Sequence, residues 1–400
     1  MSDAYVNNKS STKVITCYMI SALFMKKGLI TAIRQGNVGV LWNEFKAPAL
    51  KLRLKEGTII NNYKNNFEIQ NRRYLGSKER LLPFIHDIVL NHTKGIKSVA
   101  DIFGGTGVVA DMFAKEGKHI IINDILHSNY LIYQTFFGND AIDLAHISAA
   151  LEKMNAIQQY GDGYFEEIYG GKYFSKVNAD KIGSARQWIE DNKRKFSPRE
   201  YAVLVTSIIY GSDKVANTVG HYDAYRKKMN SLDKVSFKMP VINNYDCQIF
   251  KEDANKLVRH ISADLVYIDT PYNSRQYVDT YHVLENIADW KKPAVVGIAR
   301  KSMDRKDRKS QYNLKNAPQA FDDLISHINA RYVLVSFNNM AHKGSGRSNA
   351  KISHSEIIES LSKRGKIDIF RQNFKPFSSG KSNIRDHQEL LYLLEVNQYD

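Results

Sequence analysis

The chain has 400 residues, 43% of them hydrophobic, which suffices for one large domain or two ordinary ones. Its net charge of +15 favours a polyanionic partner, with nucleic acid the first expectation and a membrane surface the second. Two cysteines provide neither a disulfide framework nor a zinc spacing, and no apolar run has the length of a membrane helix. We therefore expect a cytoplasmic protein without a membrane segment.

Residues 1–65 combine a short apolar stretch with an Asn-rich end, and we treat them as an N-terminal extension without a predicted structure. Regular alternation of strands and helices begins near Arg72. Apolar residues recur at helical spacing from Leu81 to Val89, which predicts a helix with Ser77 as its N-cap.

A βαβ unit follows this helix in the sequence. An apolar strand over 98–103 leads through a glycine turn into a helix over 108–117, and a second strand covers 119–125. This order implies a parallel sheet with helices on its faces. The predicted fold class is therefore α/β, with a doubly wound, Rossmann-like sheet.

From residue 151 to residue 245 the pattern changes to helices and loops that are rich in aromatic and basic residues. Ser197, Pro198 and Glu200 have the spacing of a capping box with proline at the first helical position. Strand patterns return at 265–269, 331–337, 366–370 and 389–396. The last two predict an antiparallel hairpin at one edge of the sheet. The predicted domains are an extension (1–65), a core (66–150 and 246–400) and a helical insertion for target recognition (151–245).

Gly105 and Gly107 lie in the turn between the first strand and its helix, in a Gly-x-Gly-x-x-Ala pattern. Without side chains there, the backbone can approach a ligand closely at a helix N-terminus. Asp124 ends the next strand, and a carboxylate at that distance suits the two hydroxyls of a ribose. The pattern predicts a nucleoside-type cofactor. A nicotinamide dinucleotide also fits the spacing, and a plain tight turn is the structural alternative.

The stretch Asp269-Thr270-Pro271-Tyr272 follows an apolar strand. The exocyclic amine of a base can attack a methyl donor when a carboxylate and a backbone carbonyl accept hydrogen bonds from its N–H groups. Asp269 offers the carboxylate, Pro271 a carbonyl on a stiffened backbone, and Tyr272 a ring that can stack on an extruded base. These three are the predicted catalytic residues; a strand end with a proline turn and a half-buried tyrosine is the structural alternative.

The order of these motifs resembles that of the N6-adenine-specific DNA methyltransferases whose target-recognition region precedes the catalytic tetrapeptide. The stretches that carry the resemblance are RRYLGSK (72–78), DIFGGTG (101–107), NDI (123–125), IFKEDA (249–254) and DTPY (269–272). Thr270 departs from the commonest tetrapeptide, at a position whose side chain has no assigned chemical role. The resemblance implies a Rossmann-like methyltransferase sheet, a helical target-recognition insertion and S-adenosylmethionine as cofactor.

The cofactor-binding residues that the resemblance implies are Tyr74, Gly76, Ser77, Lys78, Asp101, Phe103, Gly104, Gly105, Gly107, Asp124, Asp253 and Asp269. Among them, Lys78 is expected at the methionine carboxylate and Asp101 near the amino group. Asp124 is expected at the ribose and Asp253 at the adenine edge. Asn273 and residues 275–277 are expected neighbours of the target base.

Two further segments are candidates for DNA contact. Residues 214–228 mix aromatic, amide and basic groups of the types that reach base edges and phosphates. Residues 291–315 contain nine Lys or Arg against two Asp, and such a run can neutralise backbone phosphates. Either segment can also be ordinary solvated surface. No histidines or cysteines have ligand spacing, so no metal is predicted.

These observations predict a site-specific DNA methyltransferase that moves a methyl group from S-adenosylmethionine to N6 of a flipped adenine in double-stranded DNA. We expect it to be the modification half of a restriction–modification pair, protecting DNA from a cognate endonuclease. Asp269 favours adenine, since serine usually replaces this acid in the related N4-cytosine enzymes. N4-cytosine or RNA methylation stays an alternative. From other classes, the alternatives are a nicotinamide-dependent dehydrogenase and a non-catalytic DNA-binding protein on the same scaffold.

Overall fold

The structure is a computed structural model that describes residues 66–229, 233–271, 275–338, 350–373 and 388–397. The predicted extension over 1–65 lies outside the described residues. Residues 62–400 form one of the two compact units into which the chain divides, and the description below concerns this unit alone.

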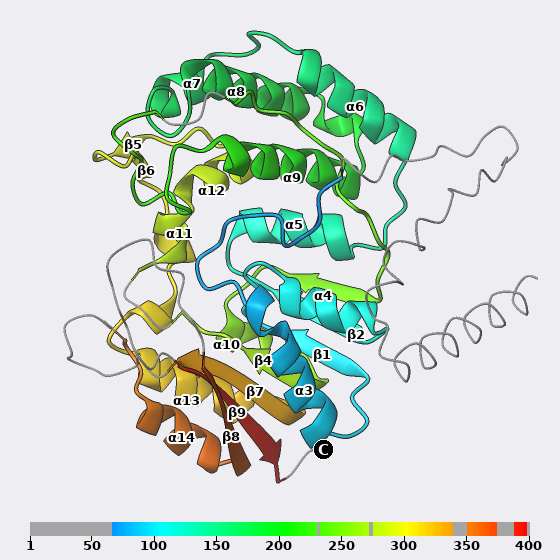
Figure 1. Ribbon diagram of the computed structural model, residues 1–400, viewed down its shortest axis with the longest axis vertical. Helices are drawn as coiled ribbons and strands as arrows, with labels where there is room; N and C mark the ends of the chain where they lie inside the picture. Colours follow the sequence, from blue (N-terminus) through cyan, green and yellow to red (C-terminus); the bar gives the residue numbers. More distant parts are fainter. Residues whose placement is uncertain (1–65, 230–232, 272–274, 339–349, 374–387, 398–400) are drawn as a thin grey trace, which may run out of the picture. The chain divides into compact units, whose positions relative to one another are not determined.

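A seven-stranded sheet forms the lower half of this unit in Figure 1, in the order β3-β2-β1-β4-β7-β9-β8. The strands are β1 (Ser98–Asp101), β2 (His119–Asn123), β3 (Cys247–Phe250), β4 (Ala263–Ile268), β7 (Ala330–Asn338), β8 (Gly365–Asn373) and β9 (Gln388–Val396). The first five strands in this order, from β3 to β7, are parallel to one another, and β9 runs antiparallel between β7 and β8. The predicted α/β fold with a C-terminal antiparallel hairpin is confirmed. The strand order reverses between β1 and β4, and ligands of doubly wound sheets bind at such a switch point.

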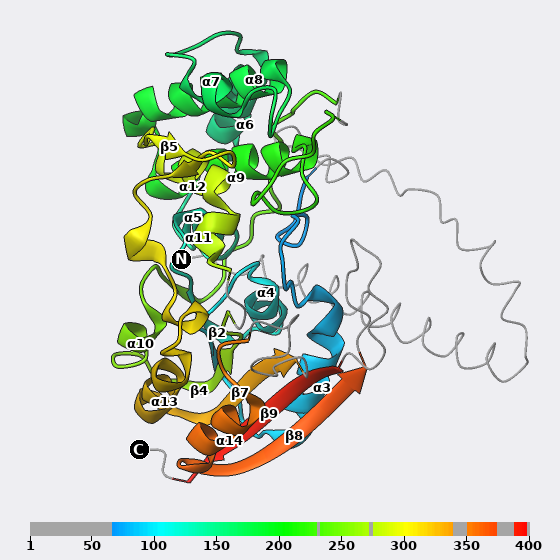
Figure 2. The same ribbon diagram turned by 90° about the vertical axis from the view of Figure 1, so that its left-hand side faces the viewer.

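Both faces of the sheet are buried, so successive residues of a strand enter different cores. Val99 and Leu265 belong to one core, whereas their neighbours Ala100 and Val266 belong to the other. This explains why the strands read as continuous apolar runs. The helices on the first face are α3 (Leu82–His92) and α4 (Val108–Lys115), and those on the second are α10 (Ala254–Leu257), α13 (Ala317–His327) and α14 (His354–Ser362). Figure 2 shows α3 and α14 on opposite sides of the C-terminal strands.

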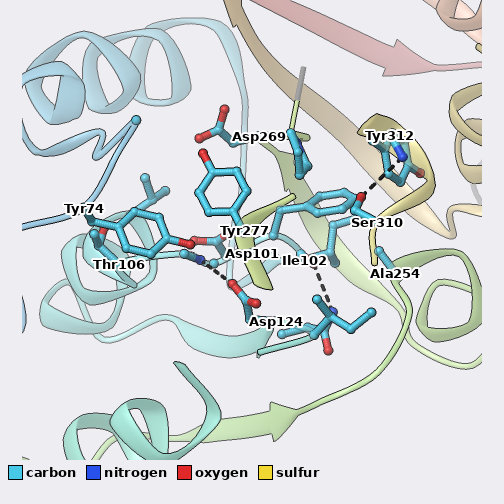
Figure 3. Close-up of a pocket in the computed structure, with 18 of the residues that line it drawn as sticks. Tyr74, Asp101, Ile102, Thr106, Asp124, Ala254, Asp269, Tyr277, Ser310 and Tyr312 are labelled. Carbon is cyan, nitrogen blue, oxygen red and sulfur yellow. Dashed lines mark hydrogen bonds between the residues drawn. The ribbon is translucent and has the colours of Figure 1, made fainter. Parts of the chain in front are cut away.

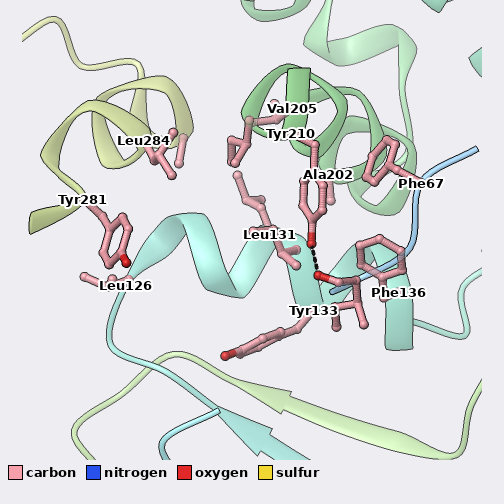
Figure 4. Close-up of a cluster of buried hydrophobic side chains, with 14 of the residues drawn as sticks. Phe67, Leu126, Leu131, Tyr133, Phe136, Ala202, Val205, Tyr210, Tyr281 and Leu284 are labelled. Atoms are coloured by element: carbon pink, nitrogen blue, oxygen red, sulfur yellow. Dashed lines mark hydrogen bonds between the residues drawn. The ribbon is translucent and has the colours of Figure 1, made fainter. Parts of the chain in front are cut away.

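A layer of helices lies above the sheet in Figure 1. Its members are α5 (His127–Phe137), α6 (Leu144–Ala156), α7 (Tyr164–Tyr169), α8 (Lys176–Asp191), α9 (Pro198–Val215), α11 (Tyr277–Thr280) and α12 (His282–Asp289). Leu131 and Phe136 of α5 face Val205 and Tyr210 of α9 in Figure 4. Phe67 stacks on Tyr210 with the ring centres 4.4 Å apart, so the segment before the core motifs is part of this cluster. None of the described helices combines the length and hydropathy needed to cross a membrane.

The helix predicted to start after Ser77 begins later in the structure. Residues Glu79–Leu81 form a 3-10 turn, and α3 starts at Leu82 with Leu81 as its N-cap, so the prediction of Ser77 as the cap was wrong. Pro83 explains the difference, because proline lacks an amide hydrogen and fits an α-helix only in its first turn. The capping box predicted at Ser197 and Glu200 is present at the start of α9.

Strand β3 and a small hairpin are among the elements that the sequence did not predict. Strand β3, next to β2, was not predicted because it is a short, partly exposed edge strand that contains the polar Gln248. Residues Val295–Val296 (β5) and Lys301–Ser302 (β6) form a small antiparallel hairpin inside the basic segment 291–315.

Candidate active site

A pocket opens at the carboxyl ends of β1, β2 and β4, where the strand order reverses, and it contains about 900 Å³ of space including its entrance. It brings together every predicted cofactor residue except Gly107: Tyr74, Gly76, Ser77, Lys78, Asp101, Phe103, Gly104, Gly105, Asp124, Asp253 and Asp269. Pro271 also lines it. Tyr272 and Asn273 lie outside the described residues, so the predicted stacking ring stays a prediction.

The glycine turn brings backbone close to this pocket. Gly107 has φ +80° and is the N-cap of α4, a left-handed conformation that favours glycine. A Cβ atom at Gly107 would lie 2.7 Å from Ile69 Cδ1. Gly107 therefore supports the turn from behind, while Gly105 and Thr106 face the pocket.

Asp124 is held by three donors at the end of β2. Its Oδ2 atom accepts hydrogen bonds from the backbone N–H of Gly105 at 3.1 Å and from Asn129 Nδ2 at 2.8 Å. Its Oδ1 atom accepts from the N–H of Leu126 at 2.9 Å. Burial raises the pKa of Asp124 to about 6, although these donors favour the ionised form. The bonds fix the carboxylate between the glycine turn and α5.

Asp101, at the end of β1, is 1% exposed and lines the same pocket. Its Oδ1 atom is buried and has no hydrogen-bond partner among the described residues. Burial, followed by the nearby charges of Asp269 and Asp124, raises the pKa of Asp101 to about 8. A buried carboxylate oxygen without a donor is costly, so a ligand that donates a hydrogen bond here, such as an ammonium group, would be stabilised.

Asp269 pairs with Lys78 in the structure. Lys78 Nζ lies 2.8 Å from Asp269 Oδ1, and the two side chains are 7% and 19% exposed. Burial raises the pKa of Asp269, and the charge of Lys78 opposes that rise. Lys78 was expected at a cofactor carboxylate; the contact that the structure shows is with Asp269, and the expected role stays a prediction.

A stack of tyrosines forms the wall beside Lys78, and Figure 3 shows Tyr74 and Tyr277 facing the same space as Asp101, Asp124 and Asp269. The rings of Tyr74 and Tyr281 are parallel with their centres 4.6 Å apart, and Tyr277 stacks on Tyr74 at 5.5 Å. The hydroxyl of Tyr281 accepts a hydrogen bond from the N–H of Leu75, and that of Tyr277 donates to the carbonyl of Leu75. These contacts join the motif at 72–78 to α11 and to Tyr281 at the start of α12.

The opposite end of the pocket is formed by Phe103, Asp253, Ser310 and Tyr312. Phe103 and Tyr312 meet edge to face, with the ring centres 5.1 Å apart. The carboxylate of Asp253 accepts from the N–H groups of Asn255 and Lys256, so it caps α10 whatever else it binds.

Sequence reasoning missed several of these residues. Tyr281 had a detectable signal, since it follows Tyr277 at helical spacing, whereas Asn129, Ser310 and Tyr312 had none. In the segment 214–228, Asn217, Thr218 and Tyr222 are buried inside the protein. Arg226, Lys227 and Lys228 remain exposed there. No cluster of metal-ligand type was found among the described residues.

The charged side chains that line the pocket limit the kinds of ligand it can bind. Five carboxylates line it (Asp101, Asp124, Glu252, Asp253 and Asp269) against two cations (Lys78 and Arg308) among the described residues. Such a site favours a cationic ligand and disfavours the pyrophosphate of a dinucleotide. A doubly wound sheet with a glycine turn and this acid-lined pocket defines a nucleoside-binding α/β protein that prefers a positively charged cofactor.

Comparison with known proteins assigns the chain to a family. The model for the D12 class N6 adenine-specific DNA methyltransferases matches residues 74–345, and the chain belongs to this family. It is 34% identical over 346 residues to the modification methylase StsI of Streptococcus sanguinis, covering 80% of this chain and 51% of that protein. It is 29% identical over 346 residues to the type II methyltransferase M.NlaIII of Neisseria lactamica, covering 80% of this chain and 98% of that protein.

The chain is also 29% identical to the modification methylase LlaI of Lactococcus lactis, covering 81% of this chain and 55% of that protein. It therefore spans about half the length of StsI and of LlaI. A solved S-adenosylmethionine-dependent methyltransferase from Agrobacterium tumefaciens aligns with 80% of this chain and 61% of that protein at 12% identity. Its TM-score of 0.28 is too low to establish a shared arrangement. The family and its fold imply S-adenosylmethionine as cofactor and DNA as substrate.

Proposed function

We propose that the protein transfers a methyl group from S-adenosylmethionine to N6 of an adenine flipped out of double-stranded DNA. The observation that carries this proposal is the placement of Asp269 and Pro271 on the same acid-lined pocket as the glycine turn, Asp101 and Asp124. A nucleobase amine held at Asp269 would therefore lie beside the cofactor pocket. Membership of the adenine-specific family supports the choice of base.

The residues present fit S-adenosylmethionine, which carries a sulfonium, an ammonium and a carboxylate and so has a net positive charge. Asp101 Oδ1, which lacks a donor among the described residues, would accept from the ammonium group. Asp124 would accept from the ribose hydroxyls through lone pairs that its three donors leave available. Phe103 and Tyr312 would flank the adenine ring, with Asp253 near its edge.

When bound, the cofactor supplies an electrophilic methyl group on sulfur. The chain itself has to hold the target amine and keep water out. The charge of Lys78 favours the ionised form of the Asp269 carboxylate, and its Nζ atom lies at Oδ1, so Oδ2 would accept a hydrogen bond from the adenine amine. The carbonyl of Pro271 would accept the second N–H, and Tyr272 would stack on the base. Accepting both N–H groups favours a tetrahedral nitrogen with an available lone pair, and Asp269 or water can take the proton that is lost.

The names of the relatives support a proposed biological setting. StsI and LlaI are modification methylases and M.NlaIII is a type II methyltransferase, so we place this protein in a restriction–modification system with an endonuclease of the same specificity. The helical segment 151–245 would serve target recognition, on a core formed by 66–150 and 246–400.

The proposal is tested with purified protein, isotope-labelled S-adenosylmethionine and unmethylated genomic DNA, followed by analysis of the digested nucleosides. We expect label in N6-methyladenine, and a loss of about 10³-fold in the rate for Asp269→Ala, because that variant cannot hold the amine. Asp368→Ala, which removes an exposed carboxylate of β8, is the control and should keep the wild-type rate. Label in N4-methylcytosine, or unchanged turnover by Asp269→Ala, would contradict the proposal.

A further inference from the structure

A buried arginine lies behind the wall of the cofactor pocket. Arg72 is 8% exposed, and its guanidinium donates from Nη1 to Oδ1 of Asn129 at 3.0 Å. The Nε and Nη2 atoms of Arg72 are buried and have no hydrogen-bond partner among the described residues. Burying a charged group with two unsatisfied donors is costly. The contribution of Arg72 to stability therefore does not explain why a cation occupies this place.

The side-chain amide of Asn129 connects Arg72 to the pocket. Asn129 is fully buried on α5, and its Nδ2 atom donates to Oδ2 of Asp124 at 2.8 Å and to the hydroxyl of Tyr74 at 3.4 Å. The oxygen and the NH2 group of an amide have nearly the same shape, so the hydrogen-bond partners decide which way the amide points. A guanidinium can only donate. Arg72 therefore selects the orientation in which the NH2 group of Asn129 faces Asp124.

The ring of Tyr74 helps to fix the position of this guanidinium. The Cζ atom of Arg72 lies 4.7 Å from the centre of the Tyr74 ring, at the distance of a cation–π contact. The same ring packs on the glycine turn, since a Cβ atom at Gly105 would lie 3.3 Å from Tyr74 Cε1. Figure 3 shows the hydroxyl end of Tyr74 directed toward Asp124. Arg72 is thus in contact with two side chains, Tyr74 and Asn129, that both adjoin Asp124 at the pocket.

We propose that Arg72 is a positioning residue for the cofactor, which acts through Asn129 to hold the Asp124 carboxylate toward the ribose. This inference rests on the proposed function, which assigns Asp124 to the ribose hydroxyls. It adds the residue that orients this acid from outside the pocket, because Arg72 is not one of the residues that line it.

The loss of Arg72 would change the hydrogen bonds of Asp124. Without the guanidinium, the amide of Asn129 is free to turn over, and its oxygen would then lie against the Asp124 carboxylate and repel it. Asp124 would keep only its two backbone donors, the N–H groups of Gly105 and Leu126. Its Oδ2 atom would no longer be fixed from the side of α5. We therefore expect weaker cofactor binding and little change in the methyl-transfer step, which takes place at Asp269.

The test is a double-mutant cycle on the dissociation constant for S-adenosylmethionine, measured by titration calorimetry with the whole chain. Arg72→Met and Asn129→Ala should each raise this constant about tenfold. Because Arg72 acts through Asn129, the double variant should also lose about tenfold, and not the roughly hundredfold of two independent residues. The value of kcat at saturating cofactor should stay within about threefold of the wild type. Arg72→Lys keeps a cationic donor and should recover part of the affinity.

Arg73→Met is the matched control, because the neighbouring Arg73 bonds through its backbone N–H and its guanidinium to Asp213, which does not line the pocket. It should keep the wild-type affinity for the cofactor. Arg72→Met should unfold within about 3 °C of the wild type, since methionine occupies similar space without a buried charge.

Three results would overturn the inference: wild-type affinity in Arg72→Met, additive losses in the double variant, or a fall of more than about 10 °C in the unfolding temperature of Arg72→Met. The last result would show that Arg72 serves the stability of the fold. A wild-type protein that does not bind S-adenosylmethionine would overturn the proposed function as well, whereas the other failures leave it standing.

Discussion

Lys78 and Asp269 come from motifs far apart in the sequence and meet as an ion pair in a site that is largely closed to water. A carboxylate in such a place tends to bind a proton, and burial does raise the pKa of Asp269. The positive charge of Lys78 opposes that rise and favours the ionised carboxylate, the form that would accept a hydrogen bond from the target amine in the proposed reaction. The charge of Glu389 on β9 acts in the opposite direction and raises the pKa of Asp269.

Replacing Lys78 by methionine should therefore change the pH dependence of methylation. Without the cation the pKa of Asp269 rises further, so a higher pH is needed for the ionised form and for activity. We expect the acidic limb of the kcat profile to move upward by about one pH unit or more, with Lys78→Arg restoring much of the wild-type profile. The measurement is kcat at saturating substrates between about pH 6 and about pH 9. Superimposable profiles for Lys78→Met and wild type would contradict this role.

The raised pKa of Asp101 predicts that a proton is released when the cofactor binds. With a pKa of about 8, the Asp101 carboxyl of the free protein is mostly protonated at neutral pH. An ammonium group beside it favours the carboxylate, so binding lowers that pKa and releases up to about one proton at pH 7. Titration calorimetry in two buffers of different ionisation enthalpy measures this number. We expect Asp101→Asn to bind more weakly and to release no proton, and a wild-type heat that is independent of buffer would rule the linkage out.

At the scale of elements, the glycine turn before α4 needs glycine at residue 107 for two reasons: the left-handed backbone conformation and the close packing of neighbouring side chains. Gly107 and Gly117 flank α4 and have nearly equal φ angles, +80° and +76°. A Cβ atom at Gly107 would lie within 3.3 Å of Tyr133 and Phe137 and closer still to Ile69, whereas nothing lies within 4 Å of one at Gly117. Substitutions at the two glycines therefore allow the cost of the left-handed backbone to be distinguished from the cost of steric crowding.

Gly117→Ala should cost about 1–2 kcal/mol of stability, from the left-handed backbone alone, and should leave cofactor affinity unchanged. Gly107→Ala should cost more and should also weaken cofactor binding, since the displaced turn carries the N–H that holds Asp124. Urea unfolding and cofactor titration of both variants provide the comparison. Equal losses of stability, or wild-type cofactor affinity in Gly107→Ala, would show that the packing against Ile69 is unimportant.

The elements also show which features a sequence can reveal. The capping box of α9 was predictable because its two side chains lie within one turn of chain. The βαβ unit was predictable because buried strands and an amphipathic helix have different apolar periods. Ser77 was misassigned because the position of Pro83, and not the nearest capping residue, decides where α3 starts. Strand β3 has no pattern of its own, since the sheet stabilises it through pairing with β2.

Some features of the site could likewise be predicted from the sequence, and others could not. The identities of Asp101, Asp124 and Asp269 follow from strand ends, which parallel strands bring to one edge of a sheet. The pairing of Lys78 with Asp269 depends on how distant elements pack, and so does the stacking of Tyr74 on Tyr281. Glu285 of α12 is another such case, because it accepts hydrogen bonds from the N–H groups of His127 and Ser128 at the start of α5. Periodicity along the chain contains no information about such contacts.

For the whole molecule, two charge distributions operate at different ranges. The net charge of +15 attracts a polyanion and makes binding depend on salt, without selecting a sequence. The pocket has the opposite sign, with five lining carboxylates against two cations, and so attracts a cationic cofactor. In the proposed reaction, DNA and the sulfonium nucleoside would therefore be attracted to regions of opposite charge and would not compete.

The most direct test of the account is the methylation state of DNA in cells that make this protein. The wild type and Asp269→Ala are expressed in a host without DNA methyltransferases, and the genome is read by single-molecule sequencing. We predict N6-methyladenine at one short recognition sequence with the wild type and none with Asp269→Ala, although both proteins fold and bind S-adenosylmethionine. A genome without new methyladenine in the wild-type strain, or an identical pattern with Asp269→Ala, would contradict the assignment.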